Sequence, residues 1–345
     1  MRLFANDLGL DLGTSNVLIY VEGRGIVVRE PSVIAMDKKS GKILQVGSEA
    51  RNMLGRTPGN VVAMHPLKDG VISDHVMTVK MLQHFFKKAR TKALLNPKPR
   101  VVICVPSGVT EVQERTVINA AIEAGARRVY LVEEPLVAGM GANLDIQGPN
   151  GHRVVDIGGG TSDIAVLSMS GVAVSSSIKV AGDTFDEAIV RYVRRVHGVV
   201  ISRAMAEDVK IQIGCVDKRP EEVKMQVRGR DSITGMPRQL ELSSSEIFGV
   251  LRRPAKQIAE EVVSVLEETS PELVCDIAEN GITLTGGGSQ LYGMANLISS
   301  YTNISCTVAD DPDSCVAYGC GKSLHFINHM SVGVINFAKK SAMRE

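Results

Sequence analysis

Short apolar runs alternate with amphipathic stretches along the first half of the chain. The run at 101–106 (VVICVP) precedes a stretch of helical periodicity at about 110–124, and the run at 129–134 (VYLVEE) precedes a small-residue stretch that begins at Pro135. Apolar runs of this length are typical of buried strands, and a proline in the first turn is typical of a helix start. The alternation predicts an α/β fold with parallel strands.

Two segments interrupt this alternation. Residues 31–66 contain short apolar pieces between glycines and prolines, and residues 184–250 contain two helical stretches followed by two charged strands. We interpret both as small insertions into larger units. The polar, turn-rich stretch at 145–152 (DIQGPNGH) is the best boundary between those units. The predicted domains are residues 1–147 with 322–345, and residues 148–321.

One pattern occurs twice: an apolar run, an aspartate, and a glycine turn closed by hydroxyl residues. The copies are LGLDLGTSN at 8–16 and VVDIGGGTSD at 154–163. Glycine turns let backbone N–H groups approach an anion, and hydroxyl groups add donors. A tight hairpin without a ligand explains either copy alone equally well, but the matched pair favours two loops that clamp one nucleotide. The candidate phosphate-binding residues are Gly13, Thr14, Ser15, Gly158, Gly159, Gly160 and Thr161.

Each copy also carries a carboxylate at the end of its strand, Asp11 or Asp156. Carboxylates in this position often hold hydrated Mg²⁺, which prefers oxygen ligands. A third cluster, ITLTGGGS at 282–289, precedes a helix-like stretch at 290–299 and suits a wall for adenosine, formed by Gly286, Gly287 and Gly288. The chain lacks GxGxxG after a strand, and its one GKS lacks the earlier glycine of a Walker loop, which excludes both of those nucleotide sites.

Composition limits the possible partners. The 345 residues are 44% hydrophobic and 22% charged, which is enough for two domains with proper cores. A net charge of +1, 4% aromatic residues and no tryptophan argue against nucleic acid as a partner. Six cysteines without CxxC spacing predict free thiols in a cytoplasmic protein. Because no apolar run approaches about 18 residues, we expect the protein in the cytoplasm or on the inner membrane surface.

Longer motifs resemble the MreB family of bacterial actins, within the actin and Hsp70 superfamily. The resemblance covers about residues 7–324 and implies an actin-like fold, with two duplicated ribonuclease-H-like domains, a small inserted subdomain in each, and the nucleotide in the cleft between them. The motifs that carry it are EPSVIAM at 30–36, MLGRTPGNVVAMHPLKDGVISD at 53–74, CVPSGVTEVQER at 104–115, GARRVYLVEEP at 125–135 and ITLTGGGSQLYGM at 282–294.

The resemblance assigns further roles. It implies that Asp11 and Asp156 organise Mg²⁺, that Asn16 joins the phosphate-binding residues, and that Glu207 and Lys210 flank the adenosine of ATP. It places Glu134 where the family orients the attacking water, beside Thr161. Taken alone, Glu134 is better explained as a carboxylate that favours the dipole of the helix beginning at Pro135, and the resemblance reverses that preference.

The resemblance also implies an ATPase that forms paired antiparallel protofilaments on the inner face of the cytoplasmic membrane. Such filaments guide side-wall peptidoglycan synthesis through transmembrane elongation and adaptor proteins. Two apolar tips with basic neighbours are candidates for membrane contact, although the second also suits inward packing. They are Leu3 with Phe4, and Leu94 with Leu95.

Two alternatives stay open. One is a small-molecule kinase of the same superfamily, although neither insertion shows a cluster of substrate-pocket residues. The other is a polymerising paralogue with little hydrolysis, because the chain departs from the family at two places. Ser162 and Asp163 stand where the family reads GGGTTE, and Ala181 replaces a glycine in VAGDTFDEAI.

Overall fold

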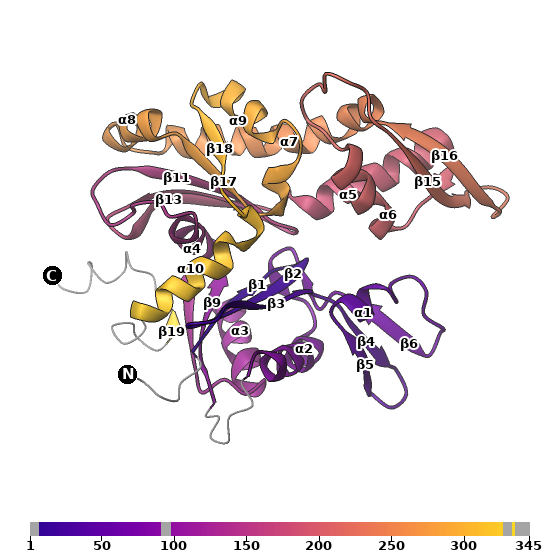
Figure 1. Cartoon of the computed structure of the whole chain (residues 1–345), viewed down its shortest axis with the longest axis horizontal. Helices are drawn as coiled ribbons and strands as arrows, with labels where there is room; N and C mark the ends of the chain where they lie inside the picture. Colours follow the sequence, from indigo (N-terminus) through magenta and orange to yellow (C-terminus); the bar gives the residue numbers. More distant parts are fainter. Residues whose placement is uncertain (1–6, 91–97, 327–332, 335–345) are drawn as a thin grey trace.

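The computed structural model describes residues 7–90, 98–326 and 333–334. The described chain forms two lobes, each built around a mixed β-sheet, and helices α4 and α10 lie between them (Figure 1). The first sheet has six strands. In spatial order they are β19 (Gly333–Val334), β10 (Arg128–Glu133), β9 (Arg100–Val105), β1 (Leu8–Leu12), β2 (Asn16–Val21) and β3 (Gly25–Pro31).

The second sheet repeats the arrangement of the first. In both, three consecutive strands form an antiparallel meander, and later strands add in parallel beside the first strand of that meander. The predicted parallel strands are therefore only part of each sheet. The strands of the second sheet, in spatial order, are β13 (Gly171–Ile178), β12 (Ser162–Ser168), β11 (His152–Ile157), β17 (Ile282–Thr285) and β18 (Cys306–Val308).

Helices cover both faces of the sheets, and each lobe has its own apolar core. A third buried cluster joins the lobes, because side chains of β9, β10, β11 and β12 pack around α4 and α10. The helices of the first lobe and its interface are α2 (His75–Ala89), α3 (Glu111–Glu123), α4 (Glu134–Gly141) and α10 (Cys315–Ser323). The helices against the second sheet are α5 (Gly182–Tyr192), α7 (Ser244–Glu267), α8 (Pro271–Asn280) and α9 (Met294–Thr302).

Both segments interpreted as insertions form small sheets at one end of their lobe (Figure 1). The first contains β4 (Ile34–Asp37), β5 (Ile43–Val46), β6 (Val61–Met64) and α1 (Ser48–Arg51). The second contains β14 (Val199–Val200), α6 (Arg203–Ile213), β15 (Lys224–Asp231) and β16 (Pro237–Ser243). Shorter elements are β7 (Leu67–Lys68), β8 (Val71–Ile72), the π-helical turn η1 (Val193–His197), and the 3-10 turns η2 (Gly287–Gln290), η3 (Pro312–Ser314) and η4 (Leu324–Phe326). The residue limits of the two domains stay a prediction.

Most local expectations agree with the structure. The helix expected at 110–124 is α3, which begins after a capping box in which Thr110 and Gln113 bond each other's backbone N–H groups. The helix expected at 290–299 begins later, at Met294. Gly293 precedes it with φ 85°, a left-handed conformation that interrupts helical geometry and favours glycine. Among the described helices, none is long and apolar enough to cross a membrane.

Candidate functional site

The two glycine turns face each other across the interface between the lobes. The first connects β1 to β2, and the second connects β11 to β12. A Cβ added at Gly160 would lie 2.6 Å from Thr14 Oγ1, and one added at Gly159 would collide with Ser15. Within the first turn, a Cβ at Gly13 would lie 2.8 Å from the carbonyl oxygen of Asn16. Glycine is therefore required both for the tight turn and for the close approach of the two hairpins.

Asp11 and Asp156 occupy equivalent places in the two sheets. Each is the penultimate residue of the first strand of its meander, and each is buried. Burial, followed by the charge of Asp156, raises the pKa of Asp11 from 3.8 to about 7. Burial likewise raises the pKa of Asp156 to about 7, although Thr285 Oγ1 donates a 2.7 Å hydrogen bond to its carboxylate. Burial of two carboxyl groups in this region disfavours their charged forms, and a bound cation would favour those forms again.

Glu134 joins this cluster as the first residue of α4. Burial, then the charges of Asp163, Asp156 and Asp11, raise the pKa of its carboxyl well above the ordinary value. One oxygen of Glu134, one of Asp11 and the sulfur of Cys104 lie within 4.8 Å of one another. Four acidic groups, Asp11, Asp156, Asp163 and Glu134, therefore lie close together, and the protonation of each depends on the charge of the others.

Asp163, one of the departures from the family, connects the lobes. It lies on β12, and its Oδ1 accepts a 3.0 Å hydrogen bond from the backbone N–H of Ser107 in the other lobe. Burial raises the pKa of Asp163 to about 6, and the bond from Ser107 opposes that rise. Ala181, the other departure, has φ −158° in extended backbone that any residue adopts, so the loss of glycine strains nothing there.

The remaining phosphate candidates surround the hairpins. Thr14 and Thr161 are buried, and Thr14 Oγ1 accepts a 3.0 Å hydrogen bond from the N–H of Gly70. Asn16 is exposed at the start of β2. The third glycine cluster lies against the second hairpin, because a Cβ at Gly286 would approach within 2.8 Å of Asp156 Oδ1.

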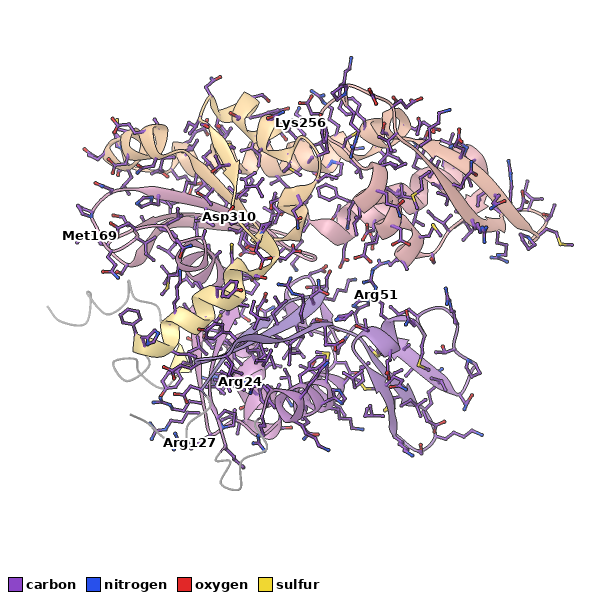
Figure 2. The ribbon with its side chains drawn as sticks, in the orientation of Figure 1. Arg24, Arg51, Arg127, Met169, Lys256 and Asp310 are labelled. Atoms are coloured by element: carbon purple, nitrogen blue, oxygen red, sulfur yellow. The ribbon has the colours of Figure 1, made fainter. Side chains whose placement is uncertain are left out.

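Glu207 and Lys210 lie one turn apart on α6, and both have protein partners. Lys210 Nζ lies 2.9 Å from Asp186 Oδ1 and donates a 3.2 Å hydrogen bond to the carbonyl oxygen of Gly182, which adjoins the second hairpin. Glu207 forms an ion pair with Arg51 of α1. Figure 2 shows Arg51 extending from the first lobe toward the second. The pair links the two small subdomains.

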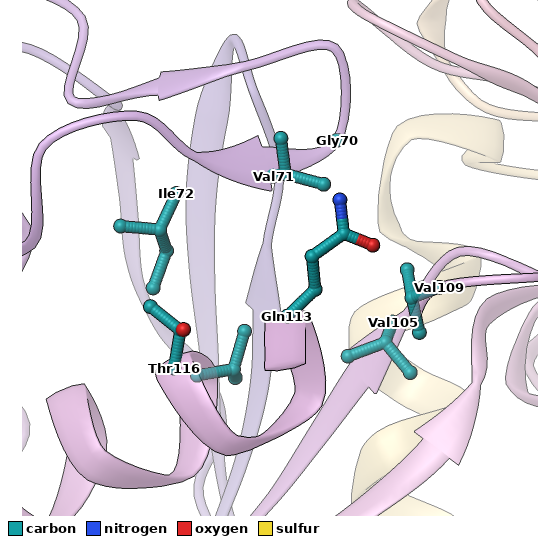
Figure 3. Close-up of a pocket in the computed structure, with 8 residues that line it drawn as sticks. Gly70, Val71, Ile72, Val105, Val109, Gln113 and Thr116 are labelled. Atoms are coloured by element: carbon teal, nitrogen blue, oxygen red, sulfur yellow. The ribbon is translucent and has the colours of Figure 1, made fainter. Parts of the chain in front are cut away.

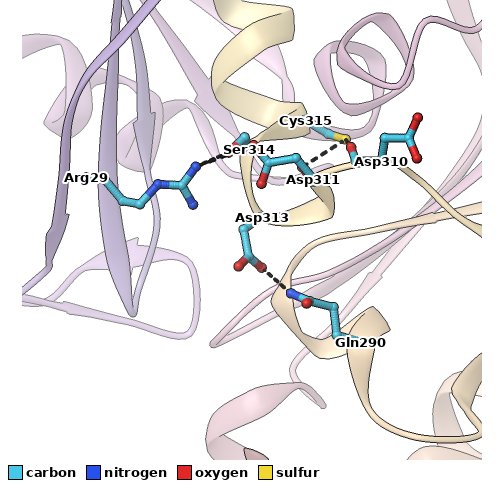
Figure 4. Close-up of polar contacts among 7 residues, drawn as sticks. All are labelled: Arg29, Gln290, Asp310, Asp311, Asp313, Ser314 and Cys315. Atoms are coloured by element: carbon cyan, nitrogen blue, oxygen red, sulfur yellow. Dashed lines mark hydrogen bonds and ion pairs between the residues drawn. The ribbon is translucent and has the colours of Figure 1, made fainter.

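A second polar link lies near η3. Arg29 of β3 donates a hydrogen bond to Ser314 Oγ and lies 3.5 Å from Asp311 Oδ2 (Figure 4). In the same view Gln290 of η2 donates a 2.9 Å hydrogen bond to Asp313 Oδ1. Sequence reasoning missed these residues, together with Cys104, Ser107 and Thr285. Only Thr285 had a local signal, since it immediately precedes the third glycine cluster.

A small cavity adjoins this cluster, between β8 and the start of α3 (Figure 3), and its lining residue Gly70 donates the hydrogen bond to Thr14. Its volume is about 40 Å³, and Val71, Ile72, Val105 and Val109 supply much of its lining. A space of this size admits water but no nucleotide. The facing hairpins and their carboxylates are therefore the stronger candidate for a nucleotide site.

Comparison with known proteins agrees with the fold and the site. Residues 5–332 match the MreB/Mbl protein family. The chain is 49% identical over 324 residues to the cell shape-determining protein Mbl of Bacillus subtilis (strain 168), covering 93% of this chain and 96% of that protein. It is 48% identical over 330 residues to the cell shape-determining protein MreB of Escherichia coli (strain K12), covering 94% and 95%.

A solved structure gives the same result. The crystal structure of MreB5 of Spiroplasma citri bound to AMPPNP superposes with a TM-score of 0.88 at 39% identity, covering 93% of this chain and 96% of that one. MreB5 has also been solved bound to ADP. The repeated sheets and facing hairpins define an actin-like protein of the ATPase superfamily. Within that class, the chain belongs to the MreB/Mbl family.

Proposed function

We propose that this chain hydrolyses ATP and assembles into filaments on the inner face of the cytoplasmic membrane, where it maintains cell shape and directs side-wall peptidoglycan synthesis. The convergence of Asp11, Asp156 and Glu134 beside two facing glycine turns supports the catalytic part best. The cell shape-determining relatives and the nucleotide-bound MreB5 structures support the cytoskeletal and nucleotide-binding parts.

In this proposal, Asp11 and Asp156 hold Mg²⁺ through its water molecules. Their oxygens are the ligands that magnesium prefers. Burial is the main cause of their raised pKa values, and a bound cation would lower those values and favour the ionised carboxylates. The hydrogen bond from Thr285 restrains the Asp156 carboxylate. When bound, the ion would neutralise charge on the phosphates.

The two hairpins would hold the phosphates between them. Backbone N–H groups at Gly13, Gly159 and Gly160, with the hydroxyls of Thr14, Ser15 and Thr161 and the amide of Asn16, would supply neutral donors. The N–H of Gly158 already donates a 2.9 Å hydrogen bond to the carbonyl oxygen of Thr161, so Gly158 would serve the turn itself. Because one hairpin belongs to each lobe, a nucleotide held by both favours the closed arrangement of the lobes.

Glu207, Lys210 and the glycines at 286–288 would flank the adenosine. Glu207 pairs with Arg51, and Lys210 pairs with Asp186. A nucleotide bound here would therefore either replace these two ion pairs or form hydrogen bonds beside them. The glycine cluster packs closely against the second hairpin, because a Cβ at Gly286 or Gly288 would collide with Ile157, so the base would lie against its backbone.

Glu134 would orient the attacking water, with Thr161 beside it. An ionised carboxylate accepts a hydrogen bond from water and aims its oxygen at the terminal phosphate, so catalysis rests on position and charge rather than on a covalent intermediate. The raised pKa of Glu134 favours its protonated form. A cation bound nearby would lower that pKa and favour the ionised form, which is the active one.

Glu134→Ala tests this role. The variant should keep its affinity for ATP but release phosphate at least about a hundredfold more slowly, because a positioned general base contributes about 10²–10⁴ in rate. Its polymers should live longer. Glu279→Ala, at an exposed glutamate on α8, is the control and should turn over ATP normally. Unchanged phosphate release in Glu134→Ala would remove Glu134 from the mechanism.

Self-association into paired antiparallel protofilaments is part of the proposal. The described surface of α3 presents Val112 with 73% of its side chain exposed, an apolar group that a protein contact would cover. ATP turnover that rises with protein concentration, without an added acceptor, would support the filament. Dependence on an added sugar or carboxylic acid would instead indicate a small-molecule kinase, and ATP-dependent polymer without turnover would indicate a paralogue with little hydrolysis.

Membrane contact is proposed through Leu3, Phe4, Leu94 and Leu95, all of which lie outside the described residues. A few such side chains bind lipid weakly in a monomer, whereas a filament repeats the site and binds strongly. The proposed partners are transmembrane elongation and adaptor proteins, which would connect the filament to the site of peptidoglycan synthesis.

A further inference from the structure

Three possible metal ligands of different chemistry meet beside the candidate nucleotide site. One oxygen of Asp11, the sulfur of Cys104 and one oxygen of Glu134 all lie within 4.8 Å of one another. The Cys104 thiol donates a 3.8 Å hydrogen bond to Asp11 Oδ1. Asp11 and Cys104 are buried, and Glu134 is partly buried. The cluster therefore combines one thiol with two carboxyl groups in a sheltered space.

The topology of the first sheet fixes these positions. Strands β1, β9 and β10 are adjacent and parallel, so their carboxyl ends meet at one edge. Leu10 pairs with Ile103, which brings the next residues, Asp11 and Cys104, to the same level. Glu134 follows directly after β10. Two donors therefore come from neighbouring strands and the third from the start of α4, and every pair of donor atoms lies within 4.8 Å.

The sulfur decides which ion this set suits. Magnesium takes oxygen ligands in octahedral geometry and leaves a thiolate unused. Zinc accepts thiolate at about 2.3 Å and carboxylate oxygen at about 2.0–2.2 Å in tetrahedral geometry, so its sulfur and oxygen ligands lie about 3.5 Å apart. The observed 3.8 Å between Cys104 Sγ and Asp11 Oδ1 is close to that separation. A water molecule would take the fourth position.

We propose that Asp11, Cys104 and Glu134 bind one thiophilic divalent cation of the zinc type in the nucleotide-free protein. On binding, the Cys104 thiol loses its proton to solvent and the thiolate forms the metal–sulfur bond, with no change of oxidation state. One consequence rests on the proposed function: an ion held by Asp11 and Glu134 competes with magnesium and ATP and blocks hydrolysis.

Metal titration of the nucleotide-free, full-length protein tests the site. Co²⁺ is the spectroscopic probe, because thiolate ligation gives a charge-transfer absorption in the near ultraviolet and tetrahedral geometry gives intense visible bands. We expect one Co²⁺ per chain with both signals, displaced by one equivalent of Zn²⁺. The buffer should contain a phosphine reductant, which keeps all thiols reduced without supplying a competing thiol.

Two variants test proposed ligands, and a third is the control. Cys104→Ser should lose the charge-transfer absorption and bind Zn²⁺ at least about tenfold more weakly, since even the loss of groups that only support a ligand costs about 10–100-fold. Glu134→Gln keeps the thiol and should also bind at least about tenfold more weakly. Cys275→Ser removes an exposed thiol on α8 and should leave both the spectrum and the affinity unchanged.

The site would be disproved by wild-type protein without thiolate absorption, by absorption that persists in Cys104→Ser, or by absorption lost in Cys275→Ser. Equal Zn²⁺ affinity in wild type and Glu134→Gln would also overturn the proposed ligand set. The thermal melting temperature of each variant checks that it is folded. Because these readouts use no ATP, a metal site can fail while hydrolysis stands, and hydrolysis can fail while the metal site stands.

Discussion

Replacing Gly9 with alanine tests how closely α10 packs against the first sheet. Gly9 lies within β1, and a Cβ added there would lie 2.7 Å from the backbone nitrogen of Gly321 and 2.8 Å from the carbonyl carbon of Cys320. Both atoms belong to the backbone of α10, so no side-chain rotation relieves the contact. For ordinary van der Waals contact at 3.4 Å, α10 must retreat by 0.7 Å, the difference between 3.4 and 2.7 Å.

The strand cannot move instead, because β1 is paired with β2 on one side and β9 on the other. Overpacking of this kind costs about 1–3 kcal/mol. An unfolding entropy of about 2.1 cal/mol/K per residue makes each kcal/mol correspond to about 1.4 °C in a chain of 345 residues. We therefore expect Gly9→Ala to melt about 1.5–4 °C lower by scanning calorimetry.

Gly171→Ala is the matched control in a strand. Its added Cβ would meet nothing closer than the carbonyl oxygen of Ser168 at 3.7 Å, an ordinary contact. We expect its melting temperature to stay within about 1 °C of the wild type. Equal melting temperatures for Gly9→Ala and Gly171→Ala would refute the close packing of α10 on β1.

Three further predictions follow from other parts of the molecule. Asp7→Asn should lower the free energy of unfolding by about 3–5 kcal/mol in urea titration, because it removes the charge of a buried carboxylate that accepts a 3.0 Å hydrogen bond from Arg100 Nε; a loss below about 1 kcal/mol would contradict this. The folded state raises the pKa of Asp156 from 3.8 to about 7, so it binds more protons than the unfolded state in that window and loses stability as pH rises through it. In magnesium-free buffer, the melting temperature of Asp156→Asn relative to wild type should therefore rise from about pH 4 to about pH 7, and a difference independent of pH would oppose the assignment. Leu94→Ser combined with Leu95→Ser should reduce sedimentation with anionic liposomes while ATP binding is kept, and equal sedimentation would indicate that these leucines pack inward.

The two glycine hairpins were predictable because their signal is local. An apolar run, an aspartate and a glycine turn specify a strand, a carboxylate at its end and a close backbone approach, whatever surrounds them. The equivalent positions of Asp11 and Asp156 in the two sheets followed from the repetition of that pattern. The later start of α9 was missed because a helical stretch of residues does not reveal the positive φ of Gly293.

Contacts between distant segments could not be predicted in this way. Arg51 and Glu207 are 156 residues apart, and Ser107 and Asp163 are 56 apart, so only the packing of the two lobes brings each pair together. The role of Glu134 came from resemblance, because its position before a proline at a helix start has an ordinary structural explanation. Cys104 had no distinguishing signal, since a cysteine within an apolar strand is typical of a core.

Electron microscopy of the purified protein on anionic lipid, with Mg-ATP and beside a nucleotide-free control, tests the central claim most directly. The account predicts paired filaments lying on the lipid with ATP and few or none without it. Absence of polymer at every concentration, in protein that demonstrably binds ATP, would contradict it.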